Sequence, residues 1–191
     1  MAAPGASEQV IVVTGGDAVD VARLADLPSG ALVIAADSGI DHALALGLHV
    51  DVAIGDFDSV SPPALRLVAA AGARVERHPE AKDETDLELA LDAAIARGAR
   101  RIHVLGGHGG RLDHFLANAL LLASPRYAAV EIVAWMGTAL VTVVRDTAVL
   151  TGRPDDLVTL LAAHGPAAGV TTQGLRYALD DEVLLAGSTR G

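Results

Sequence analysis

The sequence has 191 residues, of which 51% are hydrophobic, 20% charged and only 3% aromatic, and its formal net charge is −10 at pH 7. This length allows one domain, or one medium domain with a small second one, whose core must be filled by Ala, Val, Leu and Ile. The acidic balance disfavours nonspecific binding of nucleic acid, whose phosphates need a basic face. The lack of cysteine excludes disulfides and thiolate chemistry. No apolar run reaches the roughly 18 residues of a membrane helix, and residues 1–9 do not read as a signal peptide, so we expect a cytoplasmic protein with no membrane partner.

Two short apolar runs near the start predict buried parallel strands. Residues 10–13 end at Thr-Gly-Gly-Asp (14–17), where we expect Asp17 to cap a following helix. The glycines there could admit a phosphate to backbone amides or only turn the chain around a corner. Residues 31–36 repeat the pattern and end at an Asp-Ser-Gly turn that begins with Asp37. Because ligands bind at the carboxyl edge of open parallel sheets, this turn is a candidate site.

A third strand, expected over residues 50–54, leads directly into Gly-Asp-Phe-Asp-Ser at 55–59. Asp56 and Asp58 lie two residues apart, so in an extended or tightly turning segment their side chains can point the same way. Two ionised carboxylates so close together repel each other unless a cation lies between them, and an all-oxygen site suits Mg²⁺. The alternative is an ordinary loop whose Asp and Ser residues cap the next helix, expected over residues 62–72.

A second acidic stretch, Lys-Asp-Glu-Thr-Asp at residues 82–86, precedes a helix expected over residues 87–97. Its acidic residues could serve only the helix dipole. However, Lys82 is the only lysine in the chain, and a lone lysine beside three carboxylates favours a charge-balanced phosphate and metal site.

A further strand, residues 101–105, ends in Gly-Gly-His-Gly-Gly at residues 106–110. Glycines let the backbone wrap close to a ligand. Arg111 offers a planar fork of donors for phosphate oxygens, and Asp113 and His114 open a helix that ends near residue 122. The loop is not a P-loop, which requires Gly-Lys-Ser/Thr at its end.

Beyond residue 125 short β-type runs alternate with Gly, Pro and Asp clusters, which is typical of antiparallel structure. Strands are expected over residues 130–135 and 138–144, and over the shorter runs 149–150, 157–161, 170–172 and 182–185. We therefore expect an α/β fold with a parallel-sheet domain over residues 1–130 and a small antiparallel β domain over residues 131–191.

Four carboxylate-bearing loops, at residues 37–39, 55–59, 82–86 and 109–114, are thus expected at one edge of the sheet. Their order and spacing resemble the thiamine pyrophosphokinase (thiamine diphosphokinase) family. The resemblance is strongest over residues 10–122 and weaker in the tail. It implies a Rossmann-like α/β catalytic domain that binds ATP and Mg²⁺, a small β-sandwich domain that binds thiamine, and a homodimer with shared active sites.

The resemblance also implies the chemistry and the roles of individual residues. In this family the hydroxyl of thiamine attacks the β-phosphorus of ATP, and AMP leaves. The implied Mg²⁺ ligands are Asp56, Asp58 and Asp86, the implied phosphate-holding residues are Lys82 and Arg111, and Asp113 is implied to orient or deprotonate the hydroxyl. The remaining implied contacts to nucleotide or thiamine are Asp37, Ser38, Thr85, Gly109, Gly110, His114 and, from the other subunit, Ser188.

The tail leaves the acceptor open. The family's Ser-Asn element, which helps to hold thiamine, would begin where this sequence stops at Gly191, so we expect either a truncated chain or a differently built pocket. The same ATP and Mg²⁺ site could serve another alcohol, such as a hydroxymethylpterin. A nucleotide-binding protein without turnover is the other alternative, but it has little need of so many clustered carboxylates.

Overall fold

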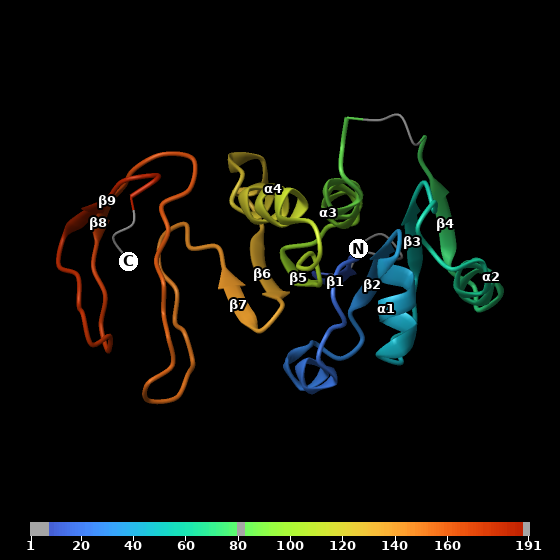
Figure 1. The fold of residues 1–191 in the computed structure, drawn as a ribbon, viewed down its shortest axis with the longest axis horizontal. Coiled ribbons are helices and arrows are strands. Elements are labelled where there is room, and N and C mark those ends of the chain that lie inside the picture. The colour runs from blue at the N-terminus through green and yellow to red at the C-terminus, as the bar shows by residue number, and fades with distance from the viewer. Residues whose placement is uncertain (1–7, 80–82, 189–191) are drawn as a thin grey trace. The chain divides into compact units, whose positions relative to one another are not determined.

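The computed structural model describes residues 8–79 and 83–188. The chain forms two compact units, the first of Met1–Leu122 with Ala129–Val143 and the second of Ala123–Ala128 with Val144–Gly191. Figure 1 shows the helices and strands of both units. In the described ranges, every helix is too short or too polar to span a membrane.

A seven-stranded sheet forms the centre of the first unit, with strand order β4-β3-β2-β1-β5-β6-β7. All neighbouring pairs are parallel except β6 and β7. The predicted parallel sheet is therefore confirmed, and its continuous apolar runs are explained because both faces are covered. The strands are β1 (Gln9–Val13), β2 (Leu32–Ala36), β3 (Val52–Gly55), β4 (Arg74–Arg77), β5 (Arg101–Leu105), β6 (Glu131–Met136) and β7 (Ala139–Thr142).

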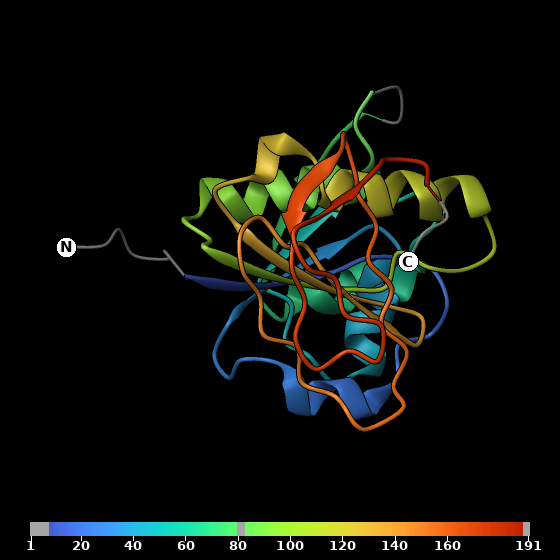
Figure 2. The same ribbon diagram turned by 90° about the vertical axis from the view of Figure 1, so that its left-hand side faces the viewer.

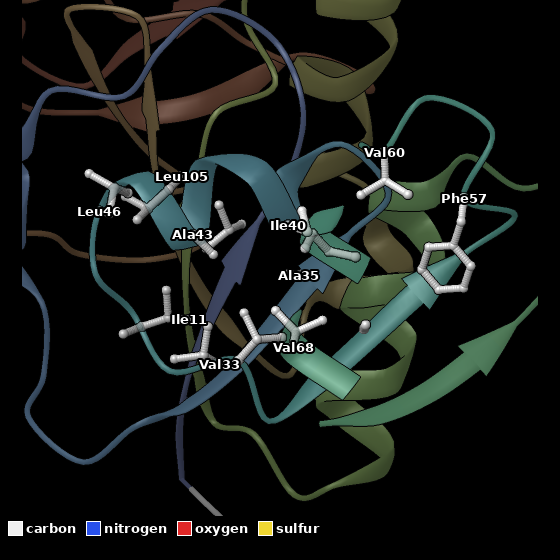
Figure 3. Close-up of a cluster of buried hydrophobic side chains, with 14 residues drawn as sticks. Ile11, Val33, Ala35, Ile40, Ala43, Leu46, Phe57, Val60, Val68 and Leu105 are labelled. Carbon is white, nitrogen blue, oxygen red and sulfur yellow. The ribbon is translucent and has the colours of Figure 1, made fainter. Parts of the chain in front are cut away.

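Helices cover both faces of this sheet, as Figure 2 shows. On one face, α1 (Gly39–Ala45) and α2 (Pro62–Ala70) pack through Ile40 and Val68 onto alternate strand residues such as Ile11 and Val33 (Figure 3). On the other face, α3 (Asp86–Ala96) packs against β1, β2 and β3, and its Leu87 is buried. A fourth helix, α4 (Leu112–Leu122), follows β5.

The connection between β1 and β2 differs from the predicted α-helix. It contains only a short 3-10 helix, η1 (Val21–Asp26), whose N-cap is Asp20. The Asp20 carboxylate accepts a hydrogen bond from the Ala22 N–H at 2.9 Å. Asp17 is therefore not the capping residue, and its side chain is available for another role.

The end of the first unit also differs from the expected boundary. Residues 131–143 were expected in the second domain, but β6 pairs in parallel with β5, and β7 completes the same sheet. In β6, Ile132, Ala134 and Met136 are buried in alternation with more exposed residues. Such alternating burial is expected for a strand near the edge of the large sheet and also for a strand of a small antiparallel sheet. The sequence pattern alone therefore could not assign β6 to one sheet or the other.

The second unit contains a small antiparallel sheet of β8 (Ala167–Val170) and β9 (Glu182–Leu184), and a 3-10 helix, η2 (Pro125–Tyr127). The fold is thus mixed α/β with a small antiparallel sheet, as expected. The predicted strands at residues 149–150 and 157–161 are wrong, since both runs lie outside strands in the structure. Their apolar side chains lie in solvent, with Val149 at 93% and Leu157 at 98% exposure.

Candidate active site

The strand order places four loops at one edge of the large sheet. From the central strand β1 the chain extends to β2 on one side and to β5 on the other. Such a reversal of winding opens a crevice at the carboxyl ends of the strands, where open α/β sheets bind their ligands. The loops after β1, β2, β3 and β5 all begin at this edge.

Three carboxylates gather there. Asp37 follows β2, and Asp56 and Asp58 follow the adjacent strand β3. One carboxylate oxygen of each lies within 4.8 Å of the others. Asp37 is only 7% exposed, and its Oδ1 is buried without a hydrogen-bond partner in the described part of the chain. Three like charges at this separation repel each other, so the arrangement favours a bound cation.

The loop after β3 is shaped by Phe57. This residue has a positive φ of 66° and is only 9% exposed, and the guanidinium of Arg77 lies 4.9 Å from its ring centroid. Figure 3 shows Phe57 at the end of β3, and its side chain belongs to the same buried cluster as Ile40 of α1 and Val68 of α2. Because the Phe57 side chain points inward, the carboxylates of Asp56 and Asp58 on either side can turn toward Asp37.

Two serine–aspartate contacts hold this loop against the neighbouring segment. The Ser59 hydroxyl donates a hydrogen bond to Asp37 Oδ2. The N–H and hydroxyl of Ser61 donate to the Asp41 carboxylate at 3.0 and 2.5 Å. Ser59 therefore uses one oxygen of Asp37 and leaves the buried Oδ1 for a ligand. Neither contact was predicted from the sequence.

A fourth carboxylate approaches from α3. A Cβ built on Gly55 would lie 3.3 Å from both Asp86 Oδ1 and Asp37 Cβ, so Asp86 stands over the end of β3 beside Asp37. Thr85 is the N-cap of α3, and its Oγ1 accepts a hydrogen bond from the Glu88 N–H at 3.2 Å. The structure thus groups two of the predicted metal ligands, Asp56 and Asp58, with Asp37, for which a nucleotide contact was predicted. It places Asp86 next to the end of β3, outside that group of three.

The composition of this cluster suits magnesium. Carboxylate oxygens are the ligands that hard divalent cations prefer, and a buried carboxylate oxygen without a hydrogen bond needs a positive partner. Asp37, Asp56, Asp58 and Asp86 supply carboxylate oxygens of this kind, and the Oδ1 of Asp37 is a buried one. Lys82, predicted to hold phosphate, lies outside the described residues.

Arg111 and Asp113 lie on the other side of the crevice, after β5. The Arg111 guanidinium donates two hydrogen bonds to the Asp113 carboxylate, from Nε at 3.2 Å and from its terminal nitrogen at 2.5 Å. This pairing lowers the pKa of Asp113 to about 2 and raises the pKa of Arg111. Asp113 is therefore ionised and a weak base in this state, which suits orienting a hydroxyl better than taking its proton.

The other predicted contact residues lie in several places. Ser38 immediately precedes α1 and makes no capping hydrogen bond with its side chain. A Cβ built on Gly110 would meet no atom of the described residues within 4 Å, whereas one built on Gly109 would overlap Asp17. His114 is exposed in the first turn of α4. Ser188 lies in the second unit, and its contact with thiamine stays a prediction.

The chain is similar in sequence and in fold to known proteins. A family model described as the thiamin pyrophosphokinase catalytic domain matches residues 27–134. The curated thiamine pyrophosphokinase of Bacillus subtilis (strain 168) is 40% identical over 91 residues. That alignment spans 48% of this chain and 42% of the relative, so the chain covers less than half the length of the curated protein that it matches.

Solved structures extend the likeness over most of the chain. The crystal structure of thiamine pyrophosphokinase from Bacillus subtilis matches with a TM-score of 0.79 and 26% identity, over 95% of this chain and 86% of the other. The thiamin pyrophosphokinase from Geobacillus thermodenitrificans matches with a TM-score of 0.65 and 28% identity, over 95% and 85%. Because the family model matches more than half of the sequence, the chain belongs to the thiamin pyrophosphokinase catalytic-domain family.

Proposed function

We propose that this protein is a thiamine diphosphokinase, which transfers the pyrophosphoryl group of ATP to the hydroxyl of thiamine and releases AMP. The observation that carries the proposal is the group of carboxylates at the carboxyl edge of the sheet in a member of this family. Their concentration at one point suits a reaction in which a highly charged polyphosphate must be neutralised and positioned.

Asp37, Asp56, Asp58 and Asp86 would hold Mg²⁺. The metal, when bound, would withdraw charge from the transferred phosphates and from the oxygen that leaves with AMP. The buried Oδ1 of Asp37 supports its inclusion among the ligands. Phe57 anchors the loop after β3 in the core, and Ser59 ties this loop to Asp37. Asp37, Asp56 and Asp58 are therefore close together before the nucleotide binds.

Arg111 and Lys82 would hold phosphate oxygens from the other side. Binding of a phosphate by Arg111 would compete with its pairing to Asp113 and so free that carboxylate to orient the acceptor hydroxyl. Ser38, Thr85, Gly109, Gly110 and His114 would line the nucleotide site.

The second unit would bind thiamine and form a homodimer, with Ser188 reaching the active site of the partner copy. Its exposed apolar side chains support this, because burial against a second copy would remove them from water. The main examples lie between residues 144 and 185: Val144, Val149, Leu150, Leu157, Leu161, Tyr177, Val183 and Leu185. Light scattering that gives the mass of a monomer at micromolar concentration would contradict this part. Because ATP is the proposed co-substrate, we also place the protein in the cytoplasm.

The test of the reaction is AMP release from ATP and Mg²⁺. We expect release to depend on thiamine, with thiamine diphosphate formed in equal amount, and to fall by orders of magnitude in Asp58→Asn. Release that depends instead on a hydroxymethylpterin would assign another acceptor to the same site. No release with either alcohol, while ATP and Mg²⁺ still bind, would indicate a nucleotide-binding protein without turnover.

A further inference from the structure

The loop after β1, residues 14–17, interlocks with the glycine loop after β5, residues 106–110. The Gly107 N–H donates to the Gly15 carbonyl oxygen at 2.7 Å, and the Asp17 N–H donates to the His108 carbonyl oxygen at 2.6 Å. A Cβ on Gly16, where φ is +124°, would overlap the His108 carbonyl. The glycines of the β1 loop therefore serve backbone-to-backbone packing, which is one of the two roles expected from the sequence.

Side chains reinforce this contact. His108 Nδ1 lies 3.4 Å from Asp17 Oδ2 and is itself buried, without a hydrogen bond in the described chain. The ring edge meets Phe115 of α4 at a centroid distance of 5.3 Å, and a Cβ on Gly137 in the β6–β7 turn would lie 3.1 Å from Nδ1. Of these three neighbours of the imidazole, only Asp17 is charged. Its carboxylate is therefore the group that can accept a hydrogen bond from Nδ1.

The same β1 loop also touches the acidic side of the crevice. A Cβ on Gly15 would overlap the Ser38 hydroxyl, and Ser38 directly follows Asp37. On its other side the loop holds His108, three residues before Arg111. The β1 loop thus connects the segment that carries a candidate metal ligand with the segment that carries the candidate phosphate-binding arginine.

We propose that Asp17 and His108 are positioning residues. Their contact, called the clasp below, holds the β1 loop (residues 14–17) against the glycine loop (residues 106–110) and so sets the separation between the carboxylate cluster and Arg111. The proposal rests on the proposed function, in which a polyphosphate is held from both sides at once. Neither residue needs to contact the nucleotide. Asp17 and His108 lower the free energy needed to order the glycine loop when ATP binds. Removing either residue should therefore change KM for ATP more than kcat.

The variants are chosen to separate the clasp from general folding. Asp17→Ala removes the carboxylate from a side chain that is 65% exposed. His108→Leu removes the ring nitrogens, whereas His108→Asn keeps a donor near the position of Nδ1. His49→Leu is the matched control, because His49 also lies beside an aspartate, with Nε2 4.0 Å from Asp51, but precedes β3 at the opposite edge of the sheet.

We expect Asp17→Ala and His108→Leu to raise KM for ATP about tenfold, to leave kcat within about threefold, and to be no worse together than singly. His108→Asn should recover most of the loss, and His49→Leu should have no effect. Hydrogen exchange measured without nucleotide should speed up in residues 106–110 of the two clasp variants and not elsewhere in β5.

Unchanged KM and unchanged exchange in Asp17→Ala would overturn the clasp, as would additive effects in the double variant. If His108→Leu does not fold, Asp17→Ala decides alone, since its side chain is exposed. Faster exchange in residues 106–110 of a protein that releases no AMP with any acceptor would leave the clasp standing and reject the proposed function instead.

Discussion

Asp58→Asn should be more stable than wild type in the absence of metal, and less stable than wild type when Mg²⁺ and nucleotide are bound. Asp58 is exposed and belongs to a group whose carboxylate oxygens lie within 4.8 Å of one another. At that distance in a water-like dielectric, each neighbouring charge costs about 0.9 kcal/mol, and more where the dielectric is lower. Replacing one of three carboxylates by an amide of the same shape therefore stabilises the metal-free protein by about 1–2 kcal/mol at low salt.

The bound state should show the opposite order. A ligand at a hundred times its Kd adds about 2.7 kcal/mol to the folded state. Wild type should gain this from Mg²⁺ with a non-hydrolysable ATP analogue, and Asp58→Asn should gain little. For a chain of this size 1 kcal/mol corresponds to about 2–4 °C in Tm, so both effects are measurable by thermal unfolding.

The assay compares Tm in EDTA with Tm in Mg²⁺ and the analogue. Asp26→Asn is the control, since Asp26 is an exposed aspartate at the end of η1 and lies outside the acidic cluster. A variant less stable than wild type in EDTA, or one that gains as much from Mg²⁺ and nucleotide, would refute the electrostatic reasoning.

Three other predictions follow from the same geometry. Phe57→Ala should lose about 3–5 kcal/mol in urea unfolding, because it empties the core under the loop; a loss under about 1 kcal/mol would contradict an anchoring role. Burial, and then the charge of Arg101, lower the pKa of His103, so its contribution to stability is complete above about pH 6.5 and is lost as the pH falls below it. His103→Leu should accordingly lose less Tm than wild type between pH 7.5 and 5.5, and an equal loss would assign the titration elsewhere. Because the pKa of Asp113 is about 2 in the protein without nucleotide, Asp113→Asn should lower kcat/KM without shifting the acid limb of the kcat/KM pH profile, and a shifted limb would assign Asp113 as the base.

The sequence predicted the edge of the sheet well because parallel strands carry a strong local signal. Continuous apolar runs ended at Asp37 and at Asp56, and parallel pairing brings the ends of neighbouring strands together. The distances between the carboxylates could not be predicted from the sequence. That Asp37 joins the carboxylate group, rather than only the nucleotide site, depends on the adjacency of β2 and β3 and on the Ser59 contact, and both appear only in three dimensions.

Other features were hidden for different reasons. Asp17 and Asp20 are both good helix caps in sequence, and only the position of the 3-10 helix selects Asp20. The contact between Asp17 and His108 spans about ninety residues, and no local pattern reports a pairing of that separation. The two short apolar runs of the second unit carry strand propensity but have no paired neighbour, and propensity without a partner does not make a strand.

In the proposed active site, carboxylates from three chain segments bind the metal that holds ATP. Anomalous diffraction from crystals grown with Mn²⁺ and a non-hydrolysable ATP analogue tests it most directly. We expect manganese about 2.1 Å from oxygens of Asp56 and Asp58, with Asp37 or Asp86 completing the protein ligands and the analogue's phosphates on the same ion. Manganese bound only away from these four residues, or nucleotide bound with no metal at them, would show that these carboxylates are not the metal site.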